Sequence, residues 1–315
     1  MARRGKNKGT PLNGWLILDK PEGLTSTQAL GKARRILDAR KVGHAGTLDP
    51  LATGVLPLAF GEATKTVPYM QDASKTYEFT VTWGAETNTD DCEGEITQTS
   101  DTRPKESDIL QALSSFQGEI EQTPPQYSAI KIDGQRAYKL ARAGEDVDIP
   151  PRKVFVYDLQ VISLSMEEVT FTCTCSKGTY IRSIARDLGR KLECLGHISQ
   201  LRRTAVGIFD ENVAISLDEL QEIVHSATPT EALLPVEAPL DDIPALFLTE
   251  PEASRLRHGQ SIVLFSKDAQ NRMNAAGLDA KREKNTVVLV RTDHKPVGLA
   301  EISGAEVKPV RILNV

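Results

Sequence analysis

The chain has 315 residues and a mass of 34.5 kDa, enough for one large domain and a second, small one. Hydrophobic residues make up 40% of the sequence and charged residues 26%, as in ordinary soluble globular proteins. No apolar run approaches the roughly 20 residues of a membrane-spanning helix, and the basic N-terminus lacks the apolar stretch of a secretory signal. The four cysteines are too scattered for a disulfide framework. We therefore expect a cytoplasmic protein without membrane association.

The net charge of −5 argues at first against a nucleic-acid partner, but the distribution of charge matters more than its sum. One basic group lies within residues 1–41, and acidic residues concentrate in 86–95 and 211–252. The members of a second basic group are Arg182, Arg186, Arg190, Lys191, Arg202 and Arg203. Either group alone is typical of a solvated face. If the fold placed both beside one site, they would favour a polyanionic partner.

In chain order, residues 14–20 predict a buried strand that ends at Pro21. Thr25 or Ser26 then caps a helix with its apolar residues on one face. Residues 42–54 contain three glycines and a proline, too many for a helix or strand interior. We therefore interpret them as a shaped loop.

A strand over 56–60 follows. Residues 76–83 alternate between apolar and polar, which predicts a half-buried strand of an antiparallel sheet. A polar turn over 86–94 leads to a helix near 107–117, and residues 121–152, rich in proline, glycine and charge, indicate a long excursion from the sheet. The residues of that helix expected to face inward are Ile109, Leu110, Leu113 and Phe116.

Strands resume at 153–164 and 168–175, and a helix is expected from about 180 to 193. A capping box of Ser216 and Glu219 begins another helix, which runs to about residue 225. The proline-rich residues after it, 226–243, indicate a linker or a surface crossing.

The rest of the chain has the pattern of a small, mostly β module. Its expected elements are a helix over 251–257, a polar stretch over 266–285, and strands near 261–265, 286–291, 296–302 and 307–314.

Several common functional motifs are absent from the sequence: the phosphate-binding loop, the dinucleotide-binding glycine pattern, the HExxH and EF-hand metal motifs, and the GxSxG elbow. One possible zinc site has four candidate ligands, Cys173, Cys175, Cys194 and His197. Two cysteines in C-x-C spacing on a flat strand are poorly placed for chelation, and packing as small apolar groups is the simpler interpretation. We expect no metal.

The loop around Asp49 is the main chemical candidate. Its glycines let a ligand approach the backbone closely, and His44 and Asp49 are the polar groups that it presents. From composition alone, an ordinary turn is the favoured interpretation of the loop, because aspartate before proline is a common turn former.

At this loop the sequence resembles a known family. The segment GHAGTLDPLATGVLPL closely resembles the catalytic motif of the TruB-type tRNA pseudouridine synthases. Further matching segments follow in family order over about residues 12–210; they are GWLILDKPEGLTS, GEATK, KTYEF, YSAIK, SKGTYIRSIARDLG and LRRTAVG.

The resemblance implies roles for seven residues. Asp49 would be the catalytic aspartate, Tyr77 the active-site tyrosine that stacks on the target base and is the proposed general base, and Arg182 the partner of the aspartate. On the substrate side, His44 would fill the space left by the flipped-out nucleotide. The other substrate-side residues that it implies are Tyr180, Leu201 and Lys20, the last with a mainly structural part.

The resemblance also implies a fold and a substrate. The expected fold is α+β, with a mixed, mainly antiparallel central sheet flanked by helices, followed by a small PUA-like RNA-binding domain. Its domains would be 1–240, with an RNA-gripping insertion at 121–152, and 241–315. The substrate would be the T-arm stem-loop of tRNA, at uridine 55 in tRNA numbering, modified by a monomer without a cofactor.

Three other functions are alternatives. A guide-RNA-dependent pseudouridine synthase and a tRNA folding chaperone share the expected fold. A retaining glycosidase needs two carboxylates at close range, and only Asp49 lies in a site-like loop.

Overall fold

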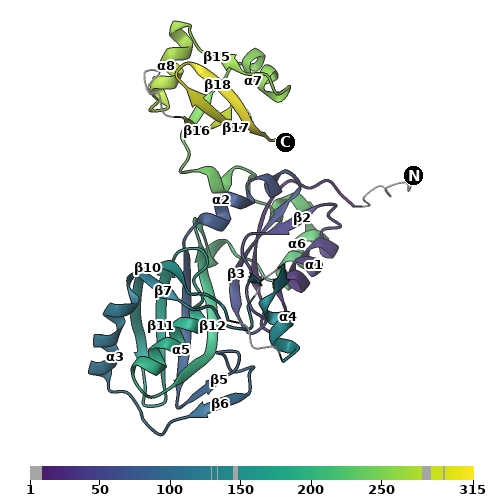
Figure 1. Ribbon diagram of the computed structural model, residues 1–315. Coiled ribbons are helices and arrows are strands. Elements are labelled where there is room, and N and C mark those ends of the chain that lie inside the picture. Colours follow the sequence, from purple (N-terminus) through teal and green to yellow (C-terminus); the bar gives the residue numbers. More distant parts are fainter. Residues whose placement is uncertain (1–8, 129, 133, 145–147, 279–284, 294) are drawn as a thin grey trace.

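The structure is a computed structural model, and it describes residues 9–128, 130–132, 134–144, 148–278, 285–293 and 295–315. A large sheet with helices around it forms most of the molecule, and a smaller β domain follows at the C-terminal end (Figure 1). This arrangement confirms the expected α+β class with a central sheet and a C-terminal β domain. None of the described helices has both the length and the apolar character needed to cross a membrane.

The large sheet is mixed and mainly antiparallel. Within the described residues its strands follow the order β1-β3-β12-β4-β11-β10-β7, while β2 pairs with β3 and β13 with β12. Only the pairing of β3 with β12 is parallel. The strands are β1 (Gly14–Lys20), β2 (Val42–His44), β3 (Thr53–Phe60), β4 (Lys75–Trp83), β7 (Gly118–Gln122), β10 (Arg152–Leu164), β11 (Glu168–Cys175), β12 (Gly196–Val206) and β13 (Phe209–Asp210).

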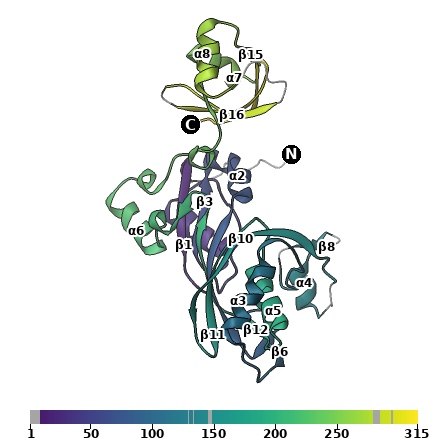
Figure 2. The same cartoon turned by 90° about the vertical axis from the view of Figure 1, so that its left-hand side faces the viewer.

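Helices cover the sheet at several places. Helix α5 packs on β12 and β4, α3 packs on β10, and α1 packs against α6 and β2. Two small hairpins and α4 lie outside the sheet, and Figure 2 shows α4 and β8 beside it. The bounds are α1 (Ser26–Ile36), α2 (Val67–Asp72), α3 (Glu106–Leu113), α4 (Ala137–Arg142), α5 (Ile181–Lys191), α6 (Leu217–Ser226), β5 (Ala85–Thr87), β6 (Ile96–Thr99), β8 (Lys131–Ile132) and β9 (Gln135–Arg136).

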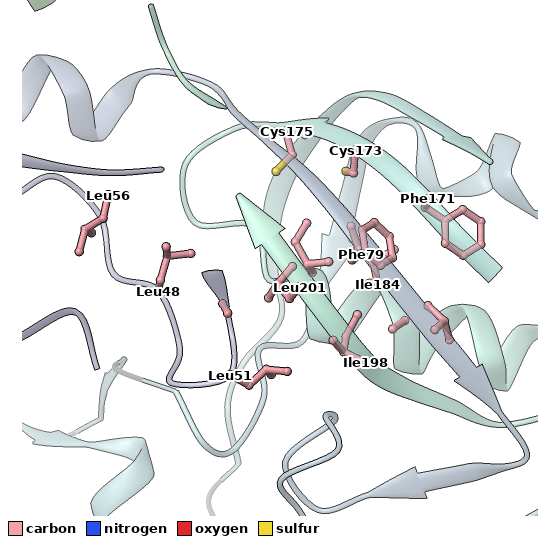
Figure 3. Close-up of a cluster of buried hydrophobic side chains, with 14 of the residues drawn as sticks. Leu48, Leu51, Leu56, Phe79, Phe171, Cys173, Cys175, Ile184, Ile198 and Leu201 are labelled. Atoms are coloured by element: carbon pink, nitrogen blue, oxygen red, sulfur yellow. The ribbon is translucent and has the colours of Figure 1, made fainter. Parts of the chain in front are cut away.

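The main core lies between this sheet and the helices α1, α3, α5 and α6. The rings of Phe79 and Phe171 stack with their centroids 5.3 Å apart, and Cys173 and Cys175 are buried next to them (Figure 3). The cysteines thus pack as small apolar groups on one strand face. Across the described residues, no group of three or more histidine, cysteine or acidic side chains is arranged to hold a metal ion.

The expectation that residues 42–54 form a loop was wrong in part. Residues 42–54 are not all loop, because β2 and the start of β3 fall within them. Gly54 has a φ of +95°, and a Cβ there would lie 2.2 Å from the Arg203 carbonyl oxygen. The glycine therefore belongs inside the strand, where it lets the β12 backbone approach closely. Strand β12 itself was not predicted as an element.

Leu110 does not face inward as expected. It is 51% exposed, while Ile109 and Leu113 of the same helix are buried, and Ala112 takes the remaining inward position. A helix presents residues at spacings of three and four to its core. Positions 109, 112, 113 and 116 satisfy that spacing, so leucine at 110 falls on the solvent side.

The C-terminal β domain is built on a second sheet of order β14-β16-β17-β18-β15. The polar stretch 266–285 contains a helix that the sequence pattern did not indicate, begun by the Ser266 side chain, which accepts from the Ala269 amide. The elements are β14 (Ala245–Phe247), α7 (Glu250–Arg257), β15 (Ile262–Val263), α8 (Lys267–Ala275), β16 (Thr286–Arg291), β17 (Pro296–Ser303) and β18 (Glu306–Ile312).

The end of this domain contacts the large one. Lys65 donates from Nζ to the Ile312 carbonyl at 2.8 Å, and the Glu62 carboxylate accepts from the Asn314 amide at 2.7 Å. Leu313 is buried in a cluster with Trp15 and Phe209. The GEATK segment therefore anchors the last strand of the chain. The boundary at residue 240 stays a prediction.

Replacing Phe79 with alanine should lower the free energy of unfolding by roughly 3–5 kcal/mol, because the side chain is fully packed and its loss leaves a cavity. Leu110→Ala removes an apolar side chain from the exposed side of α3 and should change stability by only about 0.5 kcal/mol. Chemical denaturation of the two variants checks both values. A loss at Leu110 as large as that at Phe79 would contradict the assigned face of α3.

Candidate active site

A cavity of about 290 Å³ opens beside the loop that contains Asp49. It brings together five of the seven residues expected to form a site, contributed by the 46–49 loop, β4, β12 and the start of α5; they are Asp49, Tyr77, Tyr180, Arg182 and Leu201. His44 and Lys20 do not line it.

The loop holds Asp49 between two apolar anchors. Leu48 and Leu51 are 4% and 6% exposed, and both point into the core (Figure 3). The side chain of Asp49 is 34% exposed. Burial of its neighbours therefore fixes the loop, while the carboxylate itself stays accessible from the cavity.

Hydrogen bonds from the 20–26 segment hold the same loop. The Ser26 hydroxyl accepts from the Leu48 amide at 2.7 Å and donates to the Leu48 carbonyl at 3.0 Å. The Pro50 carbonyl accepts from the Gly23 amide at 2.9 Å and from Lys20 Nζ at 3.2 Å. Residues on both sides of Asp49 are thus fixed by one short segment.

Lys20 belongs to this support. Its side chain is fully buried, and its ammonium also donates to the Pro21 and Leu24 carbonyls. Burial lowers the pKa of Lys20 to about 8, although the nearby Asp49 carboxylate opposes the shift. The geometry gives Lys20 a structural part and no contact with the cavity.

Arg182 is a buried charge, 3% exposed, and lies in the first turn of α5. Its Nη2 lies 2.9 Å from Asp49 Oδ2, and its Nη1 lies 3.5 Å from Asp91 Oδ2. The same two atoms donate to the Tyr127 carbonyl at 3.0 Å and the Thr89 carbonyl at 2.6 Å. One guanidinium therefore connects the Asp49 loop to two other segments.

The expected polar turn over 86–94 supplies buried carboxylates. Asp91 is 3% exposed and Asp90 is 7% exposed. Asp90 pairs with Arg186 of α5 at 2.9 Å. Burial raises the pKa of Asp90 to about 6 because it outweighs the opposing charges of Arg186 and Arg182. Sequence reasoning missed both aspartates; the only signal was an acidic run that is also typical of a solvated turn.

Tyr77 of β4 lies opposite Arg203 of β12 in the sheet register. Arg203 is 1% exposed; it donates to the Val55 carbonyl at 2.8 Å and, from its two Nη atoms, to the carbonyls of Thr47 and Gly46. Burial raises the pKa of Tyr77, with Arg203 opposing. The phenol is therefore protonated at neutral pH. Sequence reasoning counted Arg203 only as a basic surface residue.

The remaining expected residues surround this centre. His44 lies on β2, outside the cavity lining, and its Nδ1 is buried with no hydrogen-bond partner among the described residues. Burial, and then the charge of Arg203, lower the pKa of His44, so its ring is neutral at pH 7. Leu201 is 8% exposed and gives the cavity an apolar wall beside Phe79.

Most of the second basic group is paired or buried, although the group was expected to form a solvated face; Lys191 is exposed. Arg186 and Arg190 pair with Asp90 and Glu86, and Arg202 pairs with Asp19 and Glu211. Arg182 and Arg203 are buried. The exposed basic residues of the first group that the structure describes are Lys32, Arg34, Arg35, Arg40 and Lys41. Residues 1–8 lie outside the described part of the chain.

The chemistry that this arrangement permits is narrow. Among the described lining residues, Asp49 is the only carboxylate, and Asp91 is on the far side of the guanidinium that both share. A retaining glycosidase needs two carboxylates about 5–5.5 Å apart that both face the substrate, so the geometry disfavours it. One accessible carboxylate, a matched guanidinium and an aromatic ring fit nucleophilic chemistry on a flat, ring-containing substrate.

Ser26→Ala should lower the free energy of unfolding by roughly 1–3 kcal/mol, because it leaves the buried amide and carbonyl of Leu48 without partners. The Leu48 amide should also exchange faster with solvent hydrogen. Ser114→Ala, which removes an exposed hydroxyl that bonds only within its own turn, is the matched control. Equal stability losses in the two variants would show that Ser26 does not hold the loop.

Known families match two successive parts of the chain. The TruB family pseudouridylate synthase N-terminal domain matches residues 34–181, and the tRNA pseudouridylate synthase B C-terminal domain matches residues 182–241.

Proteins named tRNA pseudouridine synthase B are similar over the whole length. The one from Caulobacter vibrioides is 48% identical, with 100% of both chains covered. The one from Rhodopseudomonas palustris is 47% identical, covering 100% of this chain and 86% of the relative. The one from Rhodospirillum rubrum is 46% identical, with both chains fully covered.

Solved structures share the fold. A crystal structure of a Cbf5-Nop10-Gar1 complex matches with a TM-score of 0.70 and 25% identity, covering 95% of this chain and 84% of that chain. A structure of an H/ACA RNP bound to a substrate RNA containing 2'-deoxyuridine matches with a TM-score of 0.71 and 23% identity, covering 100% of this chain and 92% of that chain. The matching family models and the full-length relatives show that the chain belongs to the TruB family of pseudouridylate synthases.

Proposed function

We propose that the protein converts uridine 55 in the T arm of tRNA to pseudouridine, with the Asp49 carboxylate as the catalytic group. The observation that carries this proposal is the 2.9 Å pair of Asp49 and buried Arg182 at the wall of a cavity. The full-length likeness to proteins named tRNA pseudouridine synthase B supports it.

The reaction is an isomerisation. The bond between N1 and C1′ breaks, the base turns, and C5 bonds to C1′; C5 then loses its proton, and N1 gains one. No electron leaves the substrate, so the protein has to supply only a carboxylate beside the ribose, which either attacks C1′ or assists formation of a glycal-like intermediate. Arg182 orients that carboxylate and compensates its charge in a site with little water.

The target base has to leave its stack, at a cost of a few kcal/mol. Stacking on the Tyr77 ring offsets part of this cost, because a base that stacks on an aromatic ring gains roughly 1–3 kcal/mol of binding free energy. Burial keeps the Tyr77 phenol protonated, so in the free protein it is a stacking surface and a hydrogen-bond donor. A role as general base would require substrate binding to lower its pKa.

The other expected roles fit around this centre. Leu201 and Tyr180 line the cavity beside the base, and the neutral ring of His44 would fill the space left by the everted nucleotide. The carbonyl of Tyr127, at the root of the 121–152 insertion, accepts from Arg182, so the segment proposed to grip RNA begins beside the catalytic pair.

Recognition of the folded RNA would use shape and phosphate contacts. The exposed basic residues of α1 and of the loop after it supply positive charge, and the small β domain, from residue 241, acts as a PUA-like RNA-binding unit. The protein works as a cytoplasmic monomer without a cofactor.

Incubation of the purified chain with an unmodified tRNA transcript, followed by pseudouridine mapping, tests the function. Pseudouridine at position 55 supports it. Product that appears only with a guide RNA would favour the guide-dependent function instead, and accelerated tRNA folding without product would favour a chaperone.

Asp49→Asn should reduce the single-turnover rate of pseudouridine formation by roughly a thousandfold or more, because it removes the group proposed to act on the sugar. Arg182→Met should lower the same rate by about 100- to 1000-fold through loss of a preorganised charge, and tRNA affinity should change little in both. A tRNA chaperone activity would survive Asp49→Asn. An Asp49→Asn variant that still makes pseudouridine at the wild-type rate would refute the assigned role.

Binding of tRNA should weaken steeply as salt rises, because lysine and arginine contacts to phosphates release counterions. Titrations between about 50 and 200 mM salt measure the slope of log affinity against log salt. Removing the charges of Arg34, Arg35 and Arg40 should flatten that slope, whereas removing that of Arg190, which already pairs with Glu86, should not. A flat response in the wild-type protein would contradict a phosphate-based interface.

A further inference from the structure

Arg152 is the first residue of β10, where the chain returns from the 121–152 insertion. Its side chain lines the same cavity as Asp49 and Tyr77. The family resemblance assigned it no role, and in the sequence it is one charge in a proline-rich segment.

The guanidinium of Arg152 is held in a fixed orientation. Its Cζ lies 4.9 Å from the centroid of the Tyr180 ring, and its Nη2 donates to the Gly178 carbonyl. Tyr180 is itself fixed by Gln122, whose side chain accepts from the Tyr180 amide at 2.8 Å and donates to the Tyr180 carbonyl at 3.0 Å. Gln122 is 1% exposed and lies opposite Arg152 in the sheet. Gln122 and Arg152, at the two ends of the insertion, thus fix the position of the Tyr180 ring in the cavity wall.

Arg152 has fewer partners than the other arginines of the cavity. Arg203 also lacks a carboxylate partner among the described residues, but it donates to three backbone carbonyls, whereas the structure gives Arg152 only the Gly178 carbonyl. Arg182 pairs with Asp49, and Lys177 pairs with Asp72 at 2.6 Å. Lys75 donates to three backbone carbonyls, two in the last turn of α2 and one on the residue that follows it. No carboxylate of a described residue pairs with Arg152. Its Nε, like that of Arg182, is buried without a hydrogen-bond partner among the described residues.

A buried donor without a partner costs roughly 1–3 kcal/mol, and such a group in a cavity wall calls for a ligand to complete it. The ligand has to be an acceptor, because a guanidinium has donors only. The positive charge of Arg152, which no described carboxylate pairs, favours an anion among the possible acceptors. Its planar fork matches phosphate oxygens in pairs. We infer that Arg152 binds a backbone phosphate next to the everted uridine, with Tyr180 and Gly178 fixing the plane of its guanidinium. This inference rests on the proposed function.

The phosphate contact can be tested with a double-mutant cycle between protein and RNA. The variants are Arg152→Gln and, to keep the charge while removing the fork, Arg152→Lys. The RNAs are a T-arm stem-loop and two copies in which the phosphate on the 5′ or the 3′ side of the target uridine is an uncharged methylphosphonate. Affinity and single-turnover rate are measured for every pair.

For one of the two phosphates, Arg152→Gln and the methylphosphonate should each lower kcat/KM by roughly 10- to 100-fold. Together they should lower it little further, because both remove the same contact. The slope of log affinity against log salt should fall by about one with Arg152→Gln, a change that a purely structural role would not produce. Arg152→Lys should keep the slope and lose part of the rate.

Lys153→Gln is the matched control. It removes the same charge one residue away, from an exposed side chain that pairs with Glu119, and it should preserve the wild-type effect of both methylphosphonates. The inference is overturned if the effects of Arg152→Gln and of each methylphosphonate simply multiply, or if the salt slope does not change. If Arg152→Gln does not fold, the cycle with Arg152→Lys decides through the rates alone: effects of Arg152→Lys and of each methylphosphonate that simply multiply would overturn the inference. A wild-type protein that binds the stem-loop but forms no pseudouridine would instead refute the proposed function, because the affinity cycle is measured without turnover.

Discussion

The buried guanidinium of Arg182 is the interaction on which the site depends. A charge with so little exposure costs several kcal/mol unless it is paired and hydrogen-bonded. The two Nη atoms of Arg182 supply that pairing with two aspartates and two backbone carbonyls. Its partners come from the 46–49 loop, the 86–94 turn and the root of the insertion. Asp49 is the only one of the two carboxylates that lines the cavity, so this arrangement leaves a single oriented carboxylate facing a substrate.

Side chains of helix α5 also bind the first residues of the insertion. Ser183 and Arg186 both donate to the Thr123 carbonyl at 2.9 Å, and Arg182 donates to the Tyr127 carbonyl. The helix also packs on β12 and β4, which carry Leu201 and Tyr77. The segment proposed to grip RNA and the residues proposed to act on the base therefore both contact α5. A displacement of one would shift the helix and, through it, the other.

Much of the fold could be predicted from local patterns. The alternation over 76–83, the strand over 168–175, the helix from about 180 to 193 and the capping box at Ser216 all correspond to observed elements, because each depends on neighbours in sequence. The buried ion pairs could not be predicted in this way. Asp90 is neutralised by Arg186, which lies far along the chain, and nothing local distinguishes such an aspartate from a solvated one.

Strand β12 was missed for a related reason. Its sequence places arginines at 202 and 203. Arg202 pairs with carboxylates near the surface, and Arg203 is buried against backbone carbonyls. The alternation of polar and apolar residues along this strand therefore does not indicate which side chains are buried. At the site, the pairing of Asp49 with Arg182 came only from the family resemblance. Only the three-dimensional structure reveals that Ser26 and Lys20 support the loop. The same holds for the position of Arg203 opposite Tyr77.

Backbone hydrogen exchange in Arg182→Met, compared with the wild-type protein, tests most directly whether one guanidinium holds the three segments together. The account predicts faster exchange in residues 46–52, 87–94 and 123–128 at once, with the strands of the C-terminal β domain unchanged. Exchange that stays at the wild-type rate in these segments, or rises in only one of them, would contradict it.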